Sequence, residues 1–154
     1  MRSFCGFQQI LGLIRRKGGI FLEKLGSKTR DIKFYSKKNQ TMVMVHSKEA
    51  RAYTKYLESM EQVASYVAGK ALDAERLQMV PRVDIRGEYF ETQWQTDFYL
   101  IFADGTVGIR ELAAAGDLTK RAAVEKLELS RRYWSAAGVT NWKIVWMGGN
   151  EGVR

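Results

Sequence analysis

The clearest pattern of hydrophobic and polar positions lies in residues 94–112. Residues 98–102 form an apolar, aromatic run that is typical of a buried strand. Asp104-Gly105 follows, and this pair tolerates the positive φ that a tight hairpin turn requires. Residues 107–112 then return as a second apolar strand. The pattern therefore predicts an antiparallel hairpin at the centre of the fold.

Upstream of this hairpin, the pattern predicts a second hairpin and a helix. Residues 32–45 contain two short apolar stretches around a polar, basic turn at 37–40. Ser47 can cap a helix running to about residue 60. Residues 63–72 are small and apolar, and we expect them to carry the chain from this helix towards the sheet.

Around and after the central hairpin, four further segments are predicted. Residues 76–90 alternate loosely, which favours one or two strands interrupted by Pro81. Residues 113–117 read as a loop. Residues 118–137 form the clearest helix, capped by Asp117 or Thr119 and ended by Gly138. Residues 142–147 are expected to be a final buried strand.

The order of these elements predicts an α/β fold, with a mixed sheet flanked by helices. A chain of 154 residues fits one domain with a sizeable core. We place this domain at residues 31–154 and a basic N-terminal arm, with a short amphipathic helix at about 7–17, at residues 1–30. Because Cys5 is the only cysteine, no intrachain disulfide can form, which favours a reducing compartment, and we expect a cytoplasmic location.

The net charge of +8 is concentrated near the N-terminus. Residues 1–40 hold ten Lys and Arg residues and two acids, whereas the rest of the chain holds fifteen of each sign. Such an arm suggests contact with nucleic-acid phosphates, or with an acidic partner or surface, and a solubilising tail is the alternative. No apolar run approaches the ~20 residues of a membrane span, so we expect no membrane partner. The candidate DNA contacts are Arg15, Arg16, Lys17, Lys37 and Lys38.

Four basic residues in the predicted helix 118–137 are expected to form a solvated face rather than a DNA-binding patch, since Glu125 and Glu128 balance them. They are Lys120, Arg121, Arg131 and Arg132.

Two carboxylates meet at one end of the predicted central hairpin. Asp97 begins its first strand and Glu111 lies near the end of its second, so antiparallel pairing brings them side by side. Hard cations such as Mg²⁺ take oxygen ligands of this kind. Alternatively, Asp97 could cap its strand or pair with Arg110. Glu49, in the first turn of the predicted helix at 47–60, would on its own be read as a residue that complements the helix dipole.

Other chemistries find little support in the sequence. It contains no P-loop, no G-x-G-x-x-G dinucleotide motif and no G-x-S-x-G nucleophile elbow. One histidine and one cysteine are too few for a Cys/His zinc site. The histidine, His46, is expected to make local hydrogen bonds beside the helix start.

The order of these motifs resembles the core of the PD-(D/E)xK nuclease superfamily. Thr96-Asp97-Phe98 is followed, about a dozen residues later, by a carboxylate on the next strand. The nearest similarity is to the TnsA-type endonuclease subunit of heteromeric transposases, and it spans roughly residues 30–147. The other matching segments are His46-Ser47-Lys48-Glu49, Val63-Ala64-Ser65-Tyr66, Leu118-Thr119-Lys120 and Gly138-Val139.

This resemblance implies a restriction-endonuclease-like core and metal-assisted hydrolysis of DNA phosphodiester bonds. It assigns Glu49, Asp97 and Glu111 as catalytic residues that hold Mg²⁺ or Mn²⁺. It also implies nicking of transposon ends, with a DDE-type transposase and an AAA+ regulator as partners. The other functions considered are a phage or mobile-element nuclease such as a junction resolvase, and a catalytically silent DNA-binding or assembly module.

The chain departs from the superfamily pattern at one position. A lysine is expected two residues after the second acid, and Ala113 stands there. Loss of one electrostatic contact to the transition state commonly costs about 10²–10³ in rate. The cation could come from elsewhere, with Lys120 and Arg110 as the nearest candidates. Otherwise the chain would be inactive or altered, or would keep the fold for binding alone.

Overall fold

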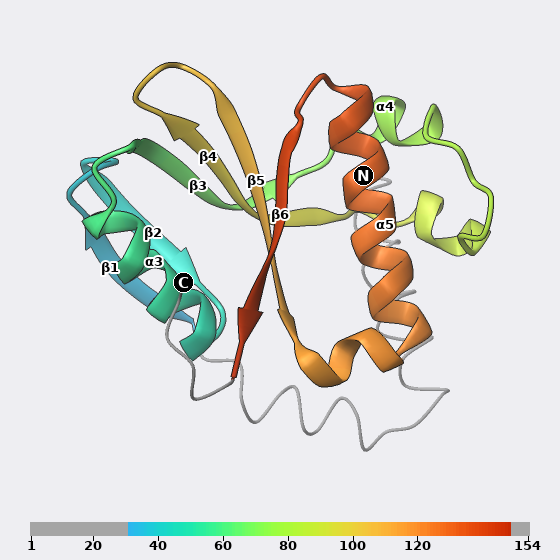
Figure 1. The fold of residues 1–154 in the computed structure, drawn as a ribbon, viewed down its shortest axis with the longest axis horizontal. Helices are drawn as coiled ribbons and strands as arrows, with labels where there is room; N and C mark the ends of the chain where they lie inside the picture. The colour runs from blue at the N-terminus through green and yellow to red at the C-terminus, as the bar shows by residue number, and fades with distance from the viewer. Residues whose placement is uncertain (1–30, 149–154) are drawn as a thin grey trace, which may run out of the picture.

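A mixed four-stranded sheet lies at the centre of the computed structural model, which describes residues 31–148 (Figure 1). Its strand order is β3 (Val63–Ala71), β4 (Gln95–Phe102), β5 (Val107–Ala114) and β6 (Asn141–Met147). The first three are antiparallel neighbours, whereas β6 runs parallel to β5. A parallel pair requires a crossover connection, which here contains a helix.

Helices cover both faces of the sheet. The crossover helix α5 (Arg121–Ala136) lies on one face, to the right in Figure 1, together with the segment that connects β3 to β4. On the other face lie α3 (Lys48–Ser59) and the hairpin of β1 (Ile32–Ser36) and β2 (Thr41–Val45). The structure therefore confirms a mixed α/β fold with helices flanking a mixed sheet.

Two hydrophobic cores correspond to these two faces, and buried aromatic side chains are central to both. The core beneath α5 contains Leu72, Leu77, Val80, Ile85, Phe90, Ile109, Leu129, Tyr133 and Trp134. The core beneath α3 and the β1–β2 hairpin contains Val45, Tyr53, Leu57, Val63, Tyr66, Phe98 and Leu100.

The local signals in the sequence place several elements correctly. Both predicted hairpins form, and Gly105 in the central turn has a positive φ of 83°. The Ser47 side chain caps α3 by accepting a hydrogen bond from the Ala50 N–H at 3.0 Å. Gly138, with φ 84°, follows the end of α5. The predicted cap at the start of α5 is wrong, because Lys120 is the N-cap residue and makes no side-chain capping bond.

The prediction for residues 76–90 is also wrong. They contain no strand; α4 (Ala74–Gln78) is followed by a turn and by the 3₁₀ helix η1 (Gly87–Glu91). Asp73 caps α4 by accepting a hydrogen bond from the Arg76 N–H. Of the apolar positions that suggested alternation, Leu77 and Ile85 are buried in the core beneath α5, whereas Met79 and Val83 are exposed, so strand pairing explains none of them.

Smaller corrections concern residues 63–72, 113–117 and 142–147. The first segment is mostly the strand β3 rather than a connection, and it pairs with β4 along most of its length. Ala113 and Ala114 belong to β5, and the 3₁₀ helix η2 (Ala115–Thr119) follows. β6 is only partly buried, because it is an edge strand and the Trp146 side chain is 54% exposed.

The turn of the β1–β2 hairpin is attached to β3 by polar side chains. Asn39 Nδ2 donates to the Tyr66 carbonyl oxygen at 2.7 Å, and Asn39 Oδ1 accepts from the Tyr66 N–H at 3.0 Å. Glu58 of α3 accepts hydrogen bonds from the hydroxyls of Ser36 and Tyr66. Burial would raise the pKa of Glu58, but these hydrogen bonds hold it below its ordinary value.

Replacing Asn39 with alanine is expected to lower the free energy of unfolding by about 1–2 kcal/mol, because both hydrogen bonds to the backbone N–H and C=O of Tyr66 are lost. Urea unfolding followed by circular dichroism measures this change. Lys37→Ala in the same turn is the control, since Lys37 is exposed. Equal stability of the two variants would show that the hairpin needs no such attachment.

The predicted N-terminal arm, its helix at about 7–17 and Arg15, Arg16 and Lys17 lie outside the described residues. Within residues 31–148, every helix is too short or too polar to cross a membrane.

Candidate functional site

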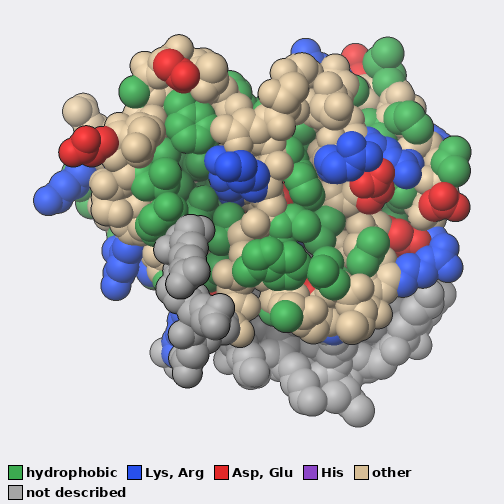
Figure 2. Space-filling model, viewed as in Figure 1, with side chains coloured by type: hydrophobic (Ala, Val, Ile, Leu, Met, Phe, Trp, Pro, Cys, Tyr) green, Lys and Arg blue, Asp and Glu red, His purple; other side chains and the backbone are tan. Residues whose placement is uncertain are grey.

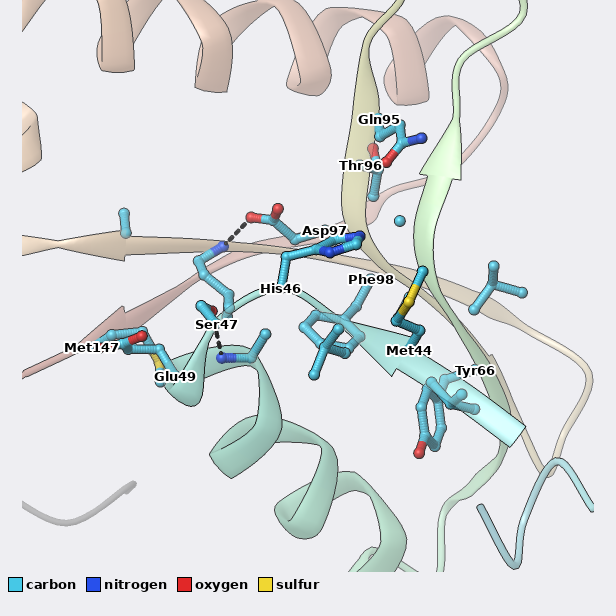
Figure 3. Close-up of a pocket in the computed structure, with 18 of the residues that line it drawn as sticks. Met44, His46, Ser47, Glu49, Tyr66, Gln95, Thr96, Asp97, Phe98 and Met147 are labelled. Atoms are coloured by element: carbon cyan, nitrogen blue, oxygen red, sulfur yellow. Dashed lines mark hydrogen bonds between the residues drawn. The ribbon is translucent and has the colours of Figure 1, made fainter. Parts of the chain in front are cut away.

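The predicted adjacency of Asp97 and Glu111 is confirmed, and it occurs where β4 and β5 separate. Backbone pairing between the two strands extends only as far as Phe98 and Arg110. Beyond that point the Asp97 N–H donates to Glu111 Oε2 at 3.0 Å, and the Leu112 N–H donates to Asp97 Oδ2 at 2.8 Å. The two carboxylates thus connect the diverging strands through reciprocal bonds to the backbone (Figure 3 draws the bond to Asp97).

Glu111 lies almost completely inside the protein. Its side chain is 2% exposed, and Oε1 accepts a hydrogen bond from the Ser130 hydroxyl of α5 at 2.5 Å. Burial, reinforced by the negative charge of Asp97, raises the pKa of Glu111 to about 7, although Ser130 and the Lys126 ammonium oppose the shift. A carboxyl group with such a pKa titrates near neutrality, which is a common property of functional sites.

Asp97, in contrast, faces an open groove of about 1210 Å³ between the sheet and the β1–β2 hairpin (Figure 3). The groove also exposes Glu49 and His46. Glu49 comes from the first turn of α3 and is labelled in Figure 3. His46 follows β2, and its Nδ1 lies 2.8 Å from Asp31 Oδ1, so the predicted local hydrogen bond is present.

The structure brings together two of the three predicted carboxylates, while Glu49 shares only the groove with Asp97. Within residues 31–148, no three His, Cys, Asp or Glu side chains form a group that could hold a metal ion. Mg²⁺, however, is often held by one or two carboxylates together with waters and substrate phosphates. In the described part of the chain, Asp97 Oδ2 accepts a hydrogen bond and Oδ1 accepts none. Oδ1 is therefore a carboxylate oxygen that could bind Mg²⁺.

Neither cation suggested as a substitute for the missing lysine lies free at this site. Lys120 pairs with Asp117 at 3.0 Å. Arg110 Nη1 donates to the carbonyl oxygens of Ile109 and Asn141, so Arg110 does not pair with Asp97. Because successive strand residues point to opposite faces, Arg110 also lies on the face opposite Glu111.

Sequence reasoning missed two residues of α5 that border the site. Ser130 bonds Glu111, and Lys126 lines the groove together with Asp97 and Ala113. Their spacing of four residues places both on one helix face, but only the packing of α5 on the sheet shows which residues that face meets.

The three arginine side chains of α5 are paired, as the sequence predicted. Arg121 contacts Glu125, and both Arg131 and Arg132 contact Glu128, each at 2.7 Å. In Figure 2, basic side chains on the right-hand part of the visible face lie next to acidic ones. The charges on this part of α5 are therefore balanced, as predicted. The face is only partly solvated, because Glu125 is buried and Arg132 donates to the carbonyl oxygens of Pro81 and Val83.

The two candidate DNA contacts in the hairpin turn differ. Lys37 is exposed, whereas Lys38 Nζ donates to the carbonyl oxygens of Met60 and Val63, each at 2.6 Å. Lys38 thus attaches the turn to the start of β3 and to the residues just before it, and Lys37 is the freer of the two.

Comparison with protein-family models gives no match, and comparison with curated proteins gives no significant one. The similarity to TnsA-type nucleases therefore rests on the residues quoted above, and the nuclease assignment stays a prediction.

Proposed function

We propose that this protein is a metal-dependent DNA endonuclease with a restriction-endonuclease-like core, similar to the TnsA subunit of heteromeric transposases. The observation that supports the proposal most directly is the pairing of Asp97 with Glu111 where β4 and β5 separate. One carboxylate faces an open groove and the other is buried against α5. A ligand that faces the groove beside a shielded one suits an ion that must also meet a substrate phosphate.

Asp97 and Glu111 would hold Mg²⁺ or Mn²⁺, and Glu49 would reach the same ion or its waters from across the groove. When bound, the ion supplies a water of lowered pKa and neutralises charge on the phosphoryl oxygens. The protein's own contribution is orientation. The Leu112 N–H fixes the Asp97 carboxylate, and the Ser130 hydroxyl fixes that of Glu111.

Within this proposal, the substrate is duplex DNA at a transposon end. Arg15, Arg16, Lys17 and Lys37 would contact its phosphates, with Lys38 supporting the turn that presents Lys37. The partners would be a DDE-type transposase and an AAA+ regulator, and the setting would be the cytoplasm.

A second candidate function follows from one observation, the absence of a lysine at position 113. A catalytically silent DNA-binding or assembly module would keep the fold and the basic arm without the chemistry. It would bind DNA in a salt-sensitive manner and cleave nothing with any divalent cation.

Titration with Mn²⁺ by calorimetry tests the proposed metal site. We expect one ion to bind the full-length protein and binding to be lost in Asp97→Ala, because that change removes the carboxylate facing the groove. Asp104→Ala is the matched control, since Asp104 lies in the turn at the opposite end of the same hairpin. Failure of the unaltered protein to bind Mn²⁺, with or without a DNA duplex, would contradict the metal site.

A further inference from the structure

The direction of α5 determines which of its residues lie over which part of β5. Since β5 and β6 are parallel and α5 connects them, α5 runs back across the sheet, antiparallel to β5. One contact fixes the register, because the Ser130 hydroxyl bonds Glu111 at 2.5 Å. Starting from this contact, each residue of α5 that faces the sheet can be assigned to the residue of β5 beneath it.

One helical turn before Ser130 stands Lys126, displaced along the helix by about 6 Å. Two residues after Glu111, on the same face of β5, stands Ala113, displaced along the strand by about 6.6 Å. Lys126 lies towards the N-terminus of the helix and Ala113 lies towards the C-terminus of the strand. Because the helix and the strand run in opposite directions, both displacements point the same way. Lys126 thus lies over Ala113, where the superfamily pattern places a lysine.

The surroundings of both residues agree with this register. Ala113 and Lys126 line the groove together with Asp97, and Lys126 also lines the small space beside Glu111 and Ser130. Ala113 is buried, and its methyl group borders the groove without carrying any charge into it. Among residues 31–148, no carboxylate forms an ion pair with Lys126.

We propose that Lys126 supplies from α5 the ammonium group that Ala113 cannot supply from β5, placing it beside the phosphate to be cleaved. This inference rests on the proposed endonuclease function. On this inference the chain is an active nuclease whose catalytic lysine comes from helix α5 and not from strand β5. The electrostatic coupling between Lys126 and Glu111 supports their proximity.

Two measurements on Lys126→Met test the inference. Removing a positive charge beside the carboxylates should strengthen Mn²⁺ binding in calorimetry by about 3–10-fold. It should also slow DNA cleavage by about 10²–10³-fold, because one contact to the developing charge is lost. Lys55→Met, which removes an exposed lysine of α3, is the matched control and should change neither quantity.

A transfer variant makes the test more specific. Ala113→Lys combined with Lys126→Ala returns the ammonium to the strand, and cleavage should recover to within about tenfold of the unaltered protein. If Lys126→Met binds Mn²⁺ and cleaves DNA as the unaltered protein does, the role of Lys126 is overturned and the proposed endonuclease function is kept. If the unaltered protein neither binds Mn²⁺ nor cleaves, both fall. If the unaltered protein binds Mn²⁺ but does not cleave DNA, the Mn²⁺ affinity of Lys126→Met is the test. Stronger binding supports a position of Lys126 beside the carboxylates, and unchanged binding overturns it.

Discussion

Replacing Asp97 with asparagine is expected to lower DNA cleavage by at least about 10³-fold while leaving the protein folded. Asparagine has nearly the same shape, and its amide oxygen can still accept the hydrogen bond from the Leu112 N–H. The change removes a negative charge beside the buried Glu111, so stability should be unchanged or slightly higher. What is lost is the anionic oxygen that faces the groove and would bind the metal ion.

Nicking of a plasmid in Mg²⁺ or Mn²⁺ measures the effect, with urea unfolding as the check on stability. Asp104→Asn is the control, because Asp104 bonds only Thr106 in the turn of the same hairpin. Equal nicking by Asp97→Asn and the unaltered protein would contradict a catalytic role. A large loss of stability in Asp97→Asn would instead show that the carboxylate mainly joins the two strands.

The sequence predicts those parts of the fold whose signals are local. Asp104-Gly105 fixes the turn of the central hairpin, and from that turn the meeting of Asp97 and Glu111 follows by counting along two antiparallel strands. Ser47 likewise marks the start of α3 by its own capping bond. Such signals act over three or four residues and need no knowledge of the tertiary structure.

Other features depend on packing and could not be found in this way. Leu77 and Val80 are spaced for a helical turn, whereas the spacing of Val83 and Ile85 suggests a strand; only the packing beneath α5 shows that Ile85 is buried and Val83 exposed. The sequence does not indicate the strand β3, because its small residues Ala68 and Gly69 have little preference for strands. Lys126 becomes a candidate only when Ser130 shows how α5 lies on β5.

Replacing Glu111 with glutamine should change the pH dependence of stability. In the native protein the pKa of Glu111 is about 7, against an ordinary value of 4.5. Between these values the native state keeps a proton that the unfolded chain releases, so the free energy of unfolding falls as pH rises. Above pH 7 both states are ionised and the cost of burying the charge is fully present. Glutamine carries no such cost, so relative to the unaltered protein the variant should gain about 1–3 kcal/mol between pH 5 and pH 8.

Urea unfolding of both proteins at several pH values between 5 and 8 measures this gain. Glu128→Gln is the matched control on α5, because hydrogen bonds from Arg131 and Arg132 lower the pKa of Glu128 to about 2. Glu128 stays ionised throughout this range, so the stability difference of its variant should not vary with pH. If the Glu111→Gln difference is equally constant, the buried carboxyl is already ionised at pH 5.

A gain in stability from Glu111→Gln, combined with a loss of Mn²⁺ binding, would show that Glu111 serves metal binding and not the stability of the fold. A carboxylate that served only to join β4 and β5 should not cost stability at neutral pH, since a neutral amide could do the same: its oxygen can accept from the Asp97 N–H and its NH₂ group can donate to the Ser130 hydroxyl oxygen. A buried acid kept at such a cost is instead what a cation site requires. The bound ion would replace the proton, and Mn²⁺ affinity should therefore rise with pH across the range in which the free protein loses stability.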